Sequence, residues 1–220
     1  MPQRQIDKRR LKLCHAVLFD LDGTIADTAP DLVAAVNKMR HDCGLEMRPP
    51  ETLRPLASAG ARGLLAGTFE IGPEHPDYAS MREEFLANYE ADLCIETTLF
   101  PGIEELLDQF DARGVRWGIV TNQGDAAGRR TAGSSVLGLA ERAAWLVCSD
   151  TTPHSKPHPA PLLHAAELME EAPERVVYVG DVQAGFAAGM VTVAAAYGYL
   201  LWEGFAADPV ACRSCGGNDN

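Results

Sequence analysis

The chain has 220 residues, of which 46% are hydrophobic and 23% are charged, and its net charge at pH 7 is −12. This composition is typical of a globular protein with one good-sized core, or with a core and a small additional unit. A surface this acidic disfavours nucleic acid and anionic membranes as partners, because both bind positively charged faces. An anionic substrate therefore needs a local positive group, such as a metal ion, a lysine or a helix N-terminus.

Cysteine usage and the N-terminal residues bear on the cellular compartment. Several of the six cysteines lie in apolar runs, as small buried side chains of a reducing compartment do. A basic N-terminal stretch and the apolar run after it resemble a signal peptide, but Lys12 and His15 interrupt that run and no small-residue cleavage site follows. No segment reaches transmembrane length. We expect a cytoplasmic protein.

An apolar run at residues 14–19 predicts a buried strand, and the sequence D-L-D-G-T follows it at residues 20–24. Residues two apart in an extended chain point to the same side, so the carboxylates of Asp20 and Asp22 are expected to meet at one spot. Two carboxylates that close repel each other, and a divalent metal ion that prefers oxygen ligands would neutralise them. The alternative is a simple turn, in which Asp and Gly are common for conformational reasons.

The next segment, residues 28–97, predicts helices and no clear strand. Thr28 is suited to cap the first helix, with Pro30 in the first turn and Asp31 three residues after the cap. The expected elements are a helix that ends at Gly44, a short helix at 51–57, a flexible turn at 58–63 and a helix at 77–93.

After residue 97 the pattern alternates between amphipathic helices and short apolar strands. The expected elements are helix 103–112, strand 115–120, strand 145–148, helix 160–171, strand 176–179 and an apolar run at 191–195. Such alternation predicts a parallel sheet covered by helices on both faces. The expected fold class is α/β: a Rossmann-like parallel sheet as catalytic core (1–27 and 98–220), with a helical cap (28–97) inserted after the first strand.

Ligands of parallel sheets bind beyond the carboxyl ends of the strands, and polar residues follow each predicted strand. Thr121 and Asn122 can hydrogen-bond an oxyanion, although turn chemistry explains them equally well. Lys156 lies between prolines in a loop at the same edge, where the alternative is a solvated surface charge. Gly180 and Asp181 follow the fourth strand. With the first two acids, this set suits Mg²⁺ and a phosphate group: carboxylates for the metal ion, lysine and hydroxyl for the anion.

Four of these motifs, in this order, resemble those of the haloacid dehalogenase-like superfamily, most of whose members are Mg²⁺-dependent phosphatases. The matching segments are residues 20–24, Thr121-Asn122, Lys156-Pro157 and Gly180-Asp181. The helical insert is similar to the helical cap of that superfamily. Within it the chain looks like the phosphoglycolate phosphatase branch, and most like bacterial N-acetylmuramic acid 6-phosphate phosphatases. The segments that carry this likeness are residues 28–32, 58–62 and 194–199.

The resemblance implies a phosphomonoesterase with a covalent intermediate. Asp20 would attack phosphorus and become an aspartyl phosphate. Asp22 would protonate the leaving alkoxide and then take a proton from the hydrolytic water. The Asp20 side chain, the backbone carbonyl of Asp22 and Asp181 would hold the Mg²⁺ ion. Thr121, Asn122 and Lys156 would bind phosphate oxygens and stabilise charge in the transition state.

The resemblance also implies how a substrate is chosen. The cap would close over the site, exclude water and select a small phosphorylated metabolite, such as phosphoglycolate or N-acetylmuramic acid 6-phosphate. Arg62, which lies between two glycines, is the candidate for recognising a substrate carboxylate or hydroxyl. An ordinary surface arginine near a helix start is an equally good explanation. The protein would act as a monomer or a homodimer.

Three regions depart from the family pattern. The segment after Asp181 reaches its A-A-G ending about four residues early, so the loop that usually carries another aspartate is missing. Residues 124–135 are rich in Gly, Ala, Arg, Thr and Ser and lack an apolar face, which predicts a weak helix at best. The segment 208–220 contains one C-x-x-C and is expected to be a disordered tail rather than a metal site.

These departures support a second hypothesis of a different class. The chain would then be a degenerate or sequence-damaged family member that binds phosphate or metal with little catalysis. A sugar-phosphate mutase is a further alternative, although mutases usually carry another acid where this chain has Gly180. A Mg²⁺-dependent phosphatase assay separates the first two hypotheses, because turnover supports the enzyme and metal binding without turnover supports the degenerate protein.

Overall fold

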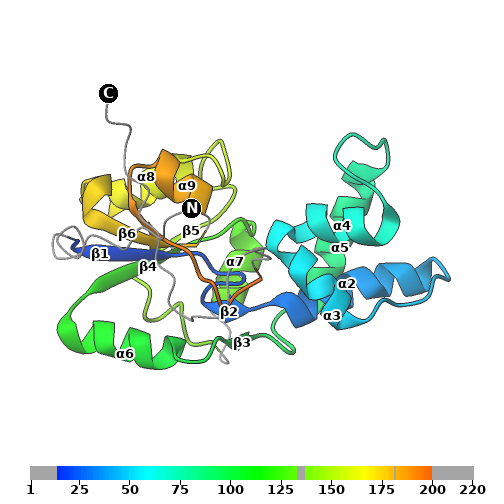
Figure 1. Ribbon diagram of the computed structural model, residues 1–220, viewed down its shortest axis with the longest axis horizontal. Coiled ribbons are helices and arrows are strands. Elements are labelled where there is room, and N and C mark those ends of the chain that lie inside the picture. Colours follow the sequence, from blue (N-terminus) through cyan, green and yellow to red (C-terminus); the bar gives the residue numbers. More distant parts are fainter. Residues whose placement is uncertain (1–13, 133–136, 181, 200–220) are drawn as a thin grey trace, which may run out of the picture.

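A parallel sheet forms the centre of the molecule. The computed structural model describes residues 14–132, 137–180 and 182–199. Five strands pair in parallel in the order β5-β4-β1-β6-β7 (Figure 1). They are β1 (Ala16–Phe19), β4 (Arg116–Val120), β5 (Trp145–Val147), β6 (Val176–Val179) and β7 (Val191–Val193). The predicted α/β fold with a parallel sheet is confirmed.

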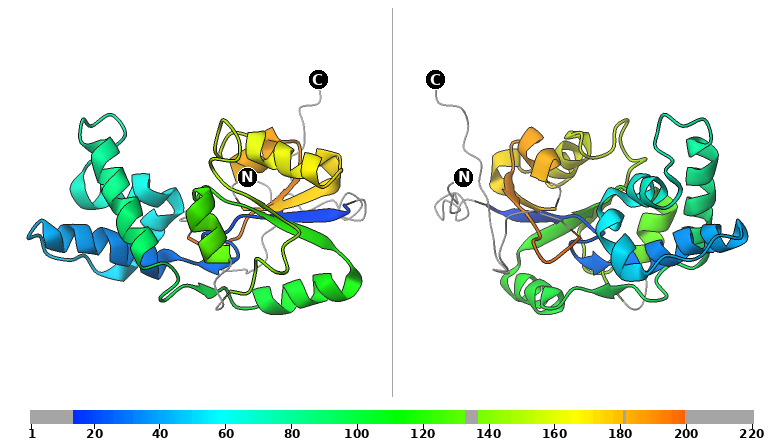
Figure 2. Two further views of the ribbon diagram at one scale, coloured as in Figure 1. Left: turned by 180° about the vertical axis from the view of Figure 1, so that it is seen from behind. Right: turned by 45° about the vertical axis from the view of Figure 1, so that its right-hand side comes forward.

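Helices cover both faces of this sheet, as Figures 1 and 2 show. α6 (Ile103–Arg113) lies on one face, and α8 (Ala160–Leu168) and α9 (Val182–Ala187) lie on the other. Successive residues of β1 alternate between the faces, with Leu18 packed in the cluster below α8 and Phe19 in the cluster that includes α6. Because both faces are buried, the strands are almost continuously apolar. A short 3-10 turn, η2, leads into β6 and consists of Pro173–Arg175.

The helical insert, residues 28–97, stands beside one end of the sheet (Figure 1). Its elements are α2 (Ala29–Asp42), α3 (Pro50–Leu53), η1 (Arg54–Ala59), α4 (Gly60–Phe69) and α5 (Tyr78–Ala91). α2 packs against both α4 and α5. Buried apolar side chains between these helices include Val36, Met39, Leu64 and Phe85. The helical character predicted for this part of the chain is therefore observed.

The flexible turn predicted at residues 58–63 is wrong. Gly60 begins α4, and Gly63 lies in the first turn of that helix. A Cβ atom at Gly63 would lie 2.4 Å from the carbonyl oxygen of Leu56 in η1. The absence of a side chain at Gly63 therefore allows α4 to pack closely against η1. The glycine that suggested a flexible turn serves this close contact.

Two short strands, absent from the sequence prediction, mark where the chain enters and leaves the helical insert. β2 (Ala26–Asp27) and β3 (Thr98–Leu99) pair antiparallel. Next to them, the buried carboxylate of Asp31 accepts hydrogen bonds from the backbone N–H groups of Glu96 (2.9 Å) and Thr97 (3.2 Å) and from the Thr97 hydroxyl (2.6 Å). These contacts tie the two connections together. Strands of two residues are too short to produce a periodic pattern.

A helix also forms where the sequence predicted a weak one at best. α7 (Asp125–Ala132) follows β4, and only one of the glycines in residues 124–135, Gly128, falls within its bounds. A Cβ atom at Gly128 would lie 2.8 Å from the Cys148 sulfur, so the glycine lets α7 approach the end of β5. The buried face of the helix consists of small residues, which a search for large apolar side chains does not detect.

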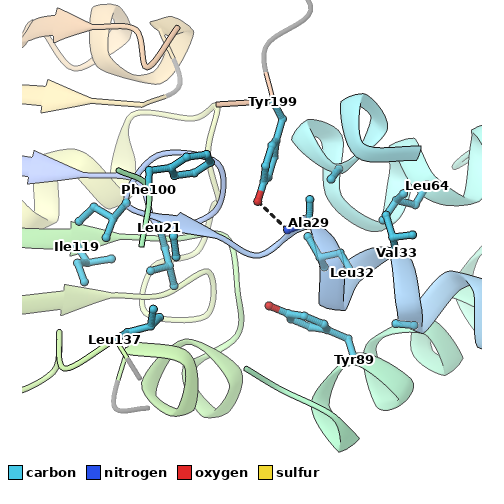
Figure 3. Close-up of a cluster of buried hydrophobic side chains, with 14 of the residues drawn as sticks. Leu21, Ala29, Leu32, Val33, Leu64, Tyr89, Phe100, Ile119, Leu137 and Tyr199 are labelled. Carbon is cyan, nitrogen blue, oxygen red and sulfur yellow. Dashed lines mark hydrogen bonds between the residues drawn. The ribbon is translucent and has the colours of Figure 1, made fainter. Parts of the chain in front are cut away.

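One apolar interior extends from the sheet into the helical insert. Figure 3 shows Leu21 and Ile119 on the sheet side, and Leu32 and Leu64 in the insert; all four belong to one buried cluster. The two parts of the molecule are therefore joined by packed side chains as well as by two chain connections. No helix in the part of the chain that the structure describes is long and apolar enough to cross a membrane.

Candidate active site

The carboxyl ends of β1, β4 and β6 form the candidate active site. Asp20 directly follows β1, and its backbone N–H donates to the carbonyl of Val179 at the end of β6 (2.8 Å). Gly180 has a φ angle of +152°, and a Cβ atom there would lie 2.6 Å from the Cβ of Asp20. Position 180 must therefore be glycine for two reasons: its backbone conformation disfavours L side chains, and the Asp20 side chain fills the space beside it.

Lys156 lies against Asp20 and is almost completely buried. Its Nζ is 2.5 Å from Oδ1 of Asp20, and its side chain is 2% exposed. The ammonium group also donates hydrogen bonds to the carbonyl of Val120 (2.7 Å) and to the hydroxyl of Tyr178 (3.2 Å). Burial raises the pKa of Asp20, while the adjacent Lys156 ammonium opposes this rise by favouring the ionised carboxylate. A buried carboxylate and its counter-ion thus stand together at the end of β1.

Asn122 holds the loop that carries Lys156. Its Nδ2 donates to the backbone carbonyl of Lys156 (2.9 Å), and the backbone N–H of Lys156 donates to its Oδ1 (3.0 Å). Both polar atoms of the Asn122 side chain are therefore engaged with the loop. The structure places Asn122 in the site as a support for Lys156, and its direct contact with a phosphate group stays a prediction.

Asp22 is held by a different set of groups. Its Oδ1 accepts hydrogen bonds from the Thr28 hydroxyl (2.7 Å) and the Gln123 amide (2.8 Å), and its Oδ2 accepts a longer one from the Thr121 hydroxyl (3.4 Å). Thr28 precedes α2 but makes no side-chain capping hydrogen bond, so its predicted capping role is wrong. The Thr28 hydroxyl donates to the Asp22 carboxyl group, and no backbone N–H of α2 donates to its oxygen. Thr121 lies in the site, and its contact with phosphate stays a prediction.

Gln123 connects the site to the helical insert, although the sequence analysis did not select it. Besides binding the Asp22 carboxylate, its Nε2 donates to the Tyr89 hydroxyl (3.1 Å), and its Oε1 accepts from the Thr131 hydroxyl (3.0 Å). Tyr89 belongs to α5 of the insert and Thr131 to α7. The sequence offered one signal for Gln123, namely its place directly after the second motif.

The segment 195–199 packs against the turn that carries the two acids. The hydroxyl of Tyr199 accepts a hydrogen bond from the backbone N–H of Ala29 (2.7 Å; Figure 3) and donates one to Oδ1 of Asp27 (3.0 Å). A Cβ atom at Gly23, whose φ is +72°, would lie 2.7 Å from the Tyr199 ring. Burial raises the pKa of Tyr199, so its hydroxyl keeps its proton. In the sequence this segment carries only a likeness to the family and no prediction of a contact with the two acids.

The predicted metal ligands are only partly within the structure. Asp181 lies outside the described residues, and among residues 14–132, 137–180 and 182–199 no group of three or more His, Cys, Asp or Glu side chains could hold a metal ion. Asp20 and Asp22 supply carboxyl oxygens at the end of β1, and Lys156 pairs with Asp20. Carboxyl oxygens are donors that Mg²⁺ prefers, so these two residues fit such an ion.

Arg62 lies on α4 with an exposed side chain, within the helical insert. Neither its exposure nor its place on α4 tests whether it contacts a substrate, so that role stays a prediction. The expected tail at residues 208–220 lies outside the described residues. The residues after position 181 form α9, which begins at Val182 and has six residues. That this segment is shorter than in the family stays a prediction.

Comparison with known proteins identifies the family. The sequence matches the haloacid dehalogenase-like hydrolase family over residues 17–195, a range that includes all four motifs. The chain belongs to this family. The family that the motifs predicted, and the predicted class of enzyme, a phosphoric monoester hydrolase, are therefore confirmed.

Haloacid dehalogenase-like relatives and a solved structure agree with this assignment. An N-acetylmuramic acid 6-phosphate phosphatase from Pseudomonas putida is 39% identical over 190 residues, which cover 84% of each chain. A phosphoglycolate phosphatase from Xanthomonas campestris pv. campestris is 42% identical over 200 residues, 88% of each chain. The crystal structure of a predicted phosphoglycolate phosphatase from Haemophilus somnus has a TM-score of 0.71 and 24% identity, and covers 85% of this chain and 87% of that one. At that identity the structural likeness supports the fold alone.

Proposed function

We propose that this protein is a Mg²⁺-dependent phosphatase that hydrolyses a small phosphorylated metabolite through an aspartyl phosphate on Asp20. The observation that carries the proposal is the buried pair of Asp20 and Lys156. A second acid, Asp22, follows Asp20 by two residues and is held by hydrogen bonds from Thr28 and Gln123. The names of the relatives support phosphoglycolate and N-acetylmuramic acid 6-phosphate as candidate substrates. A cytoplasmic location and a monomeric or homodimeric state stay predictions.

The chemistry assigned to the two acids proceeds in two steps. Asp20 forms a bond to phosphorus while the bond from phosphorus to the ester oxygen breaks, and Asp22 gives a proton to the departing alkoxide. Asp22 then takes a proton from the water molecule that attacks the phosphoenzyme. Inorganic phosphate leaves, and Asp20 returns to its carboxylate form.

The other residues hold charge and orientation. Asp20, the backbone carbonyl of Asp22 and Asp181 would hold Mg²⁺, which offsets the repulsion between an anionic carboxylate and an anionic phosphate. Lys156 and Thr121 would bind phosphate oxygens, and Asn122 would keep Lys156 in place. The part assigned to Asp181 rests on the family motif, because that residue lies outside the described ones.

The helical insert is assigned the role of a cap that covers the site and excludes water. Arg62 would then recognise a polar group of the substrate. Replacing Arg62 by alanine should lower kcat/KM for the preferred substrate more than for other phosphomonoesters. Unchanged kcat/KM values for every substrate would remove Arg62 from the site.

A screen of phosphomonoesters with Mg²⁺, including phosphoglycolate and N-acetylmuramic acid 6-phosphate, tests the proposal. Wild-type protein should release phosphate from at least one of them, and chelation with EDTA should stop the release. The Asp20→Asn variant should lose at least about a thousand-fold in kcat, because the nucleophile is gone. Asp108→Asn, which changes an exposed carboxylate on α6, should keep full activity. Full activity of Asp20→Asn would refute the assignment of the nucleophile.

One observation favours a second candidate function. α9 begins directly after residue 181, and residues 182–189 contain no acidic side chain. A metal site without that additional support would bind phosphate or metal with little catalysis. Calorimetric titration with Mg²⁺ separates the candidates: binding without turnover of any ester supports the degenerate protein, and binding with turnover supports the phosphatase.

A further inference from the structure

Gln123 is the one side chain of the described chain that joins Asp22 to both α5 and α7. Its amide group makes three hydrogen bonds, to the Asp22 carboxylate, the Tyr89 hydroxyl and the Thr131 hydroxyl, at 2.8, 3.1 and 3.0 Å. Oδ1 of Asp22 accepts a hydrogen bond both in the ionised form and when the acid proton is on Oδ2, so the amide nitrogen faces Asp22 and the amide oxygen faces Thr131. The orientation of the Gln123 amide is therefore determined by its neighbours.

The Asp22 carboxylate depends on this arrangement. Its Oδ1 receives two short hydrogen bonds, from Thr28 at the start of α2 and from Gln123. Gln123 in turn touches α5 through Tyr89. Both short contacts thus lead to helices of the insert, and Figure 3 shows the Tyr89 hydroxyl directed from α5 toward the sheet.

We propose that Gln123 is a positioning residue that orients the Asp22 carboxylate, and that Tyr89 fixes Gln123 from the helical insert. The inference rests on the proposed function, in which Asp22 is the proton donor. It adds that the position of α5 controls how well Asp22 donates its proton. If Tyr89 moved away, the Gln123 side-chain amide would lose one of its partners and would no longer hold Asp22 in one orientation. Tyr89 is 3% exposed, so water does not readily replace its hydroxyl at this contact.

The dependence on the leaving group separates this role from a merely structural one. An alkyl phosphate needs a proton on its departing oxygen, whereas p-nitrophenyl phosphate releases a stabilised phenolate that needs none. Because kcat/KM reports the steps up to departure of the leaving group, a misoriented Asp22 should lower it for the alkyl ester alone. The ratio of the two kcat/KM values is also independent of how much of a variant is folded.

The experiment compares Gln123→Met, Tyr89→Phe and the control Tyr78→Phe, with p-nitrophenyl phosphate and with whichever of phosphoglycolate and N-acetylmuramic acid 6-phosphate the wild type hydrolyses faster. Gln123→Met keeps the side-chain length and removes the amide. It should lower kcat/KM about 10- to 100-fold for the alkyl ester, a part of what general acid catalysis contributes, and by less than about 3-fold for p-nitrophenyl phosphate. Tyr78 lies on the same helix as Tyr89, so Tyr78→Phe should leave both values unchanged.

Tyr89→Phe should show the same selective loss, about 3- to 10-fold, and should add nothing in the Gln123→Met background if it acts through Gln123. Equal losses for both esters, or no loss, would overturn the positioning role while leaving the phosphatase intact. Independent, multiplying losses in the double variant would overturn the link through Tyr89. A wild type that hydrolyses neither ester would refute the proposed function, and this inference with it.

Discussion

The two carboxylates of the candidate active site are two residues apart in the chain, but different parts of the molecule hold them. Asp20 is bound by the sheet and its loops: Lys156 pairs with its carboxylate, and Val179 accepts from its backbone N–H. Asp22 is bound by Thr28, at the entrance to α2, and by Gln123, which contacts α5. The position of the proposed nucleophile thus depends on the sheet, whereas the position of the proposed acid depends on how the helical insert sits against it.

This difference suggests a division of labour. The contacts of Asp20 lie within the sheet and its loops. Two hydrogen bonds of Asp22 lead instead to the start of α2 and, through Gln123, to α5. Substitutions on the two sides should therefore have distinguishable effects.

The largest effect is expected on the sheet side, at Lys156. Lys156→Met removes the cation next to Asp20 and should lower kcat/KM about 100- to 1,000-fold, the usual loss for one group that stabilises transition-state charge. The loss should be similar for alkyl and aryl phosphates, since Lys156 acts on the phosphate and not on the leaving group. Lys38→Met, an exposed residue paired with Asp42, is the control and should keep full activity. A loss confined to alkyl phosphates would contradict the division between the two sides.

The next effect concerns the connections to the insert. Asp31→Asn replaces a buried carboxylate that accepts three hydrogen bonds by an amide whose NH₂ group faces donors. The free energy of unfolding should fall by about 1–3 kcal/mol, measured by urea denaturation. Asp77→Asn, at the exposed start of α5, should change it by less than about 0.5 kcal/mol. An unchanged free energy of unfolding for Asp31→Asn would mean that the hydrogen bonds that Asp31 accepts from Glu96 and Thr97 do not stabilise the two segments that connect the insert to the sheet.

A smaller loss is expected at Tyr199. Tyr199→Phe keeps the ring against Gly23 but removes the hydroxyl that pairs with Ala29 and Asp27. Stability should fall by about 1–2 kcal/mol, because the buried N–H of Ala29 loses its partner. Thermal unfolding measures this change. Tyr197→Phe is the comparison, because the Tyr197 hydroxyl makes one hydrogen bond, to the carbonyl of Thr24. This variant should lower the free energy of unfolding by less than Tyr199→Phe does.

The smallest effect is a dependence of stability on pH from Asp20, in protein freed of metal with EDTA. Burial raises the folded-state pKa of Asp20 above 3.8, so the folded protein keeps a proton that the unfolded chain releases. The stabilising contribution is complete below the unfolded pKa and is lost as pH rises through the folded pKa, by at most about 1.4 kcal/mol per pH unit. The stability of wild type relative to Asp20→Asn should therefore decrease as pH rises from about 4. An increase would mean that the pairing with Lys156 outweighs burial.

The sequence was sufficient for the parts of this protein that local patterns encode. Apolar runs followed by turns located the strands of the sheet, and the spacing of Asp20 and Asp22 marked the end of β1 as the centre of the site. The carboxyl ends of parallel strands meet at one edge, so Thr121 and Lys156 could be added to the set. Helix patterns in residues 28–97 identified the insert. These inferences need only the order of local patterns along the chain and the general geometry of parallel sheets.

Only the tertiary structure decided which side chains hold the two acids. Thr28 was expected to cap a helix, and Gln123, Tyr89 and Tyr199 were not selected as parts of the site, yet these four orient Asp22 or the turn that carries it. Their partners lie far away in the sequence, and a hydrogen bond depends on direction as well as distance. The same holds for α7, which packs through small residues that make no apolar pattern. Periodicity reports which face of an element is buried, but the neighbour that buries it is set by the packing of the whole chain.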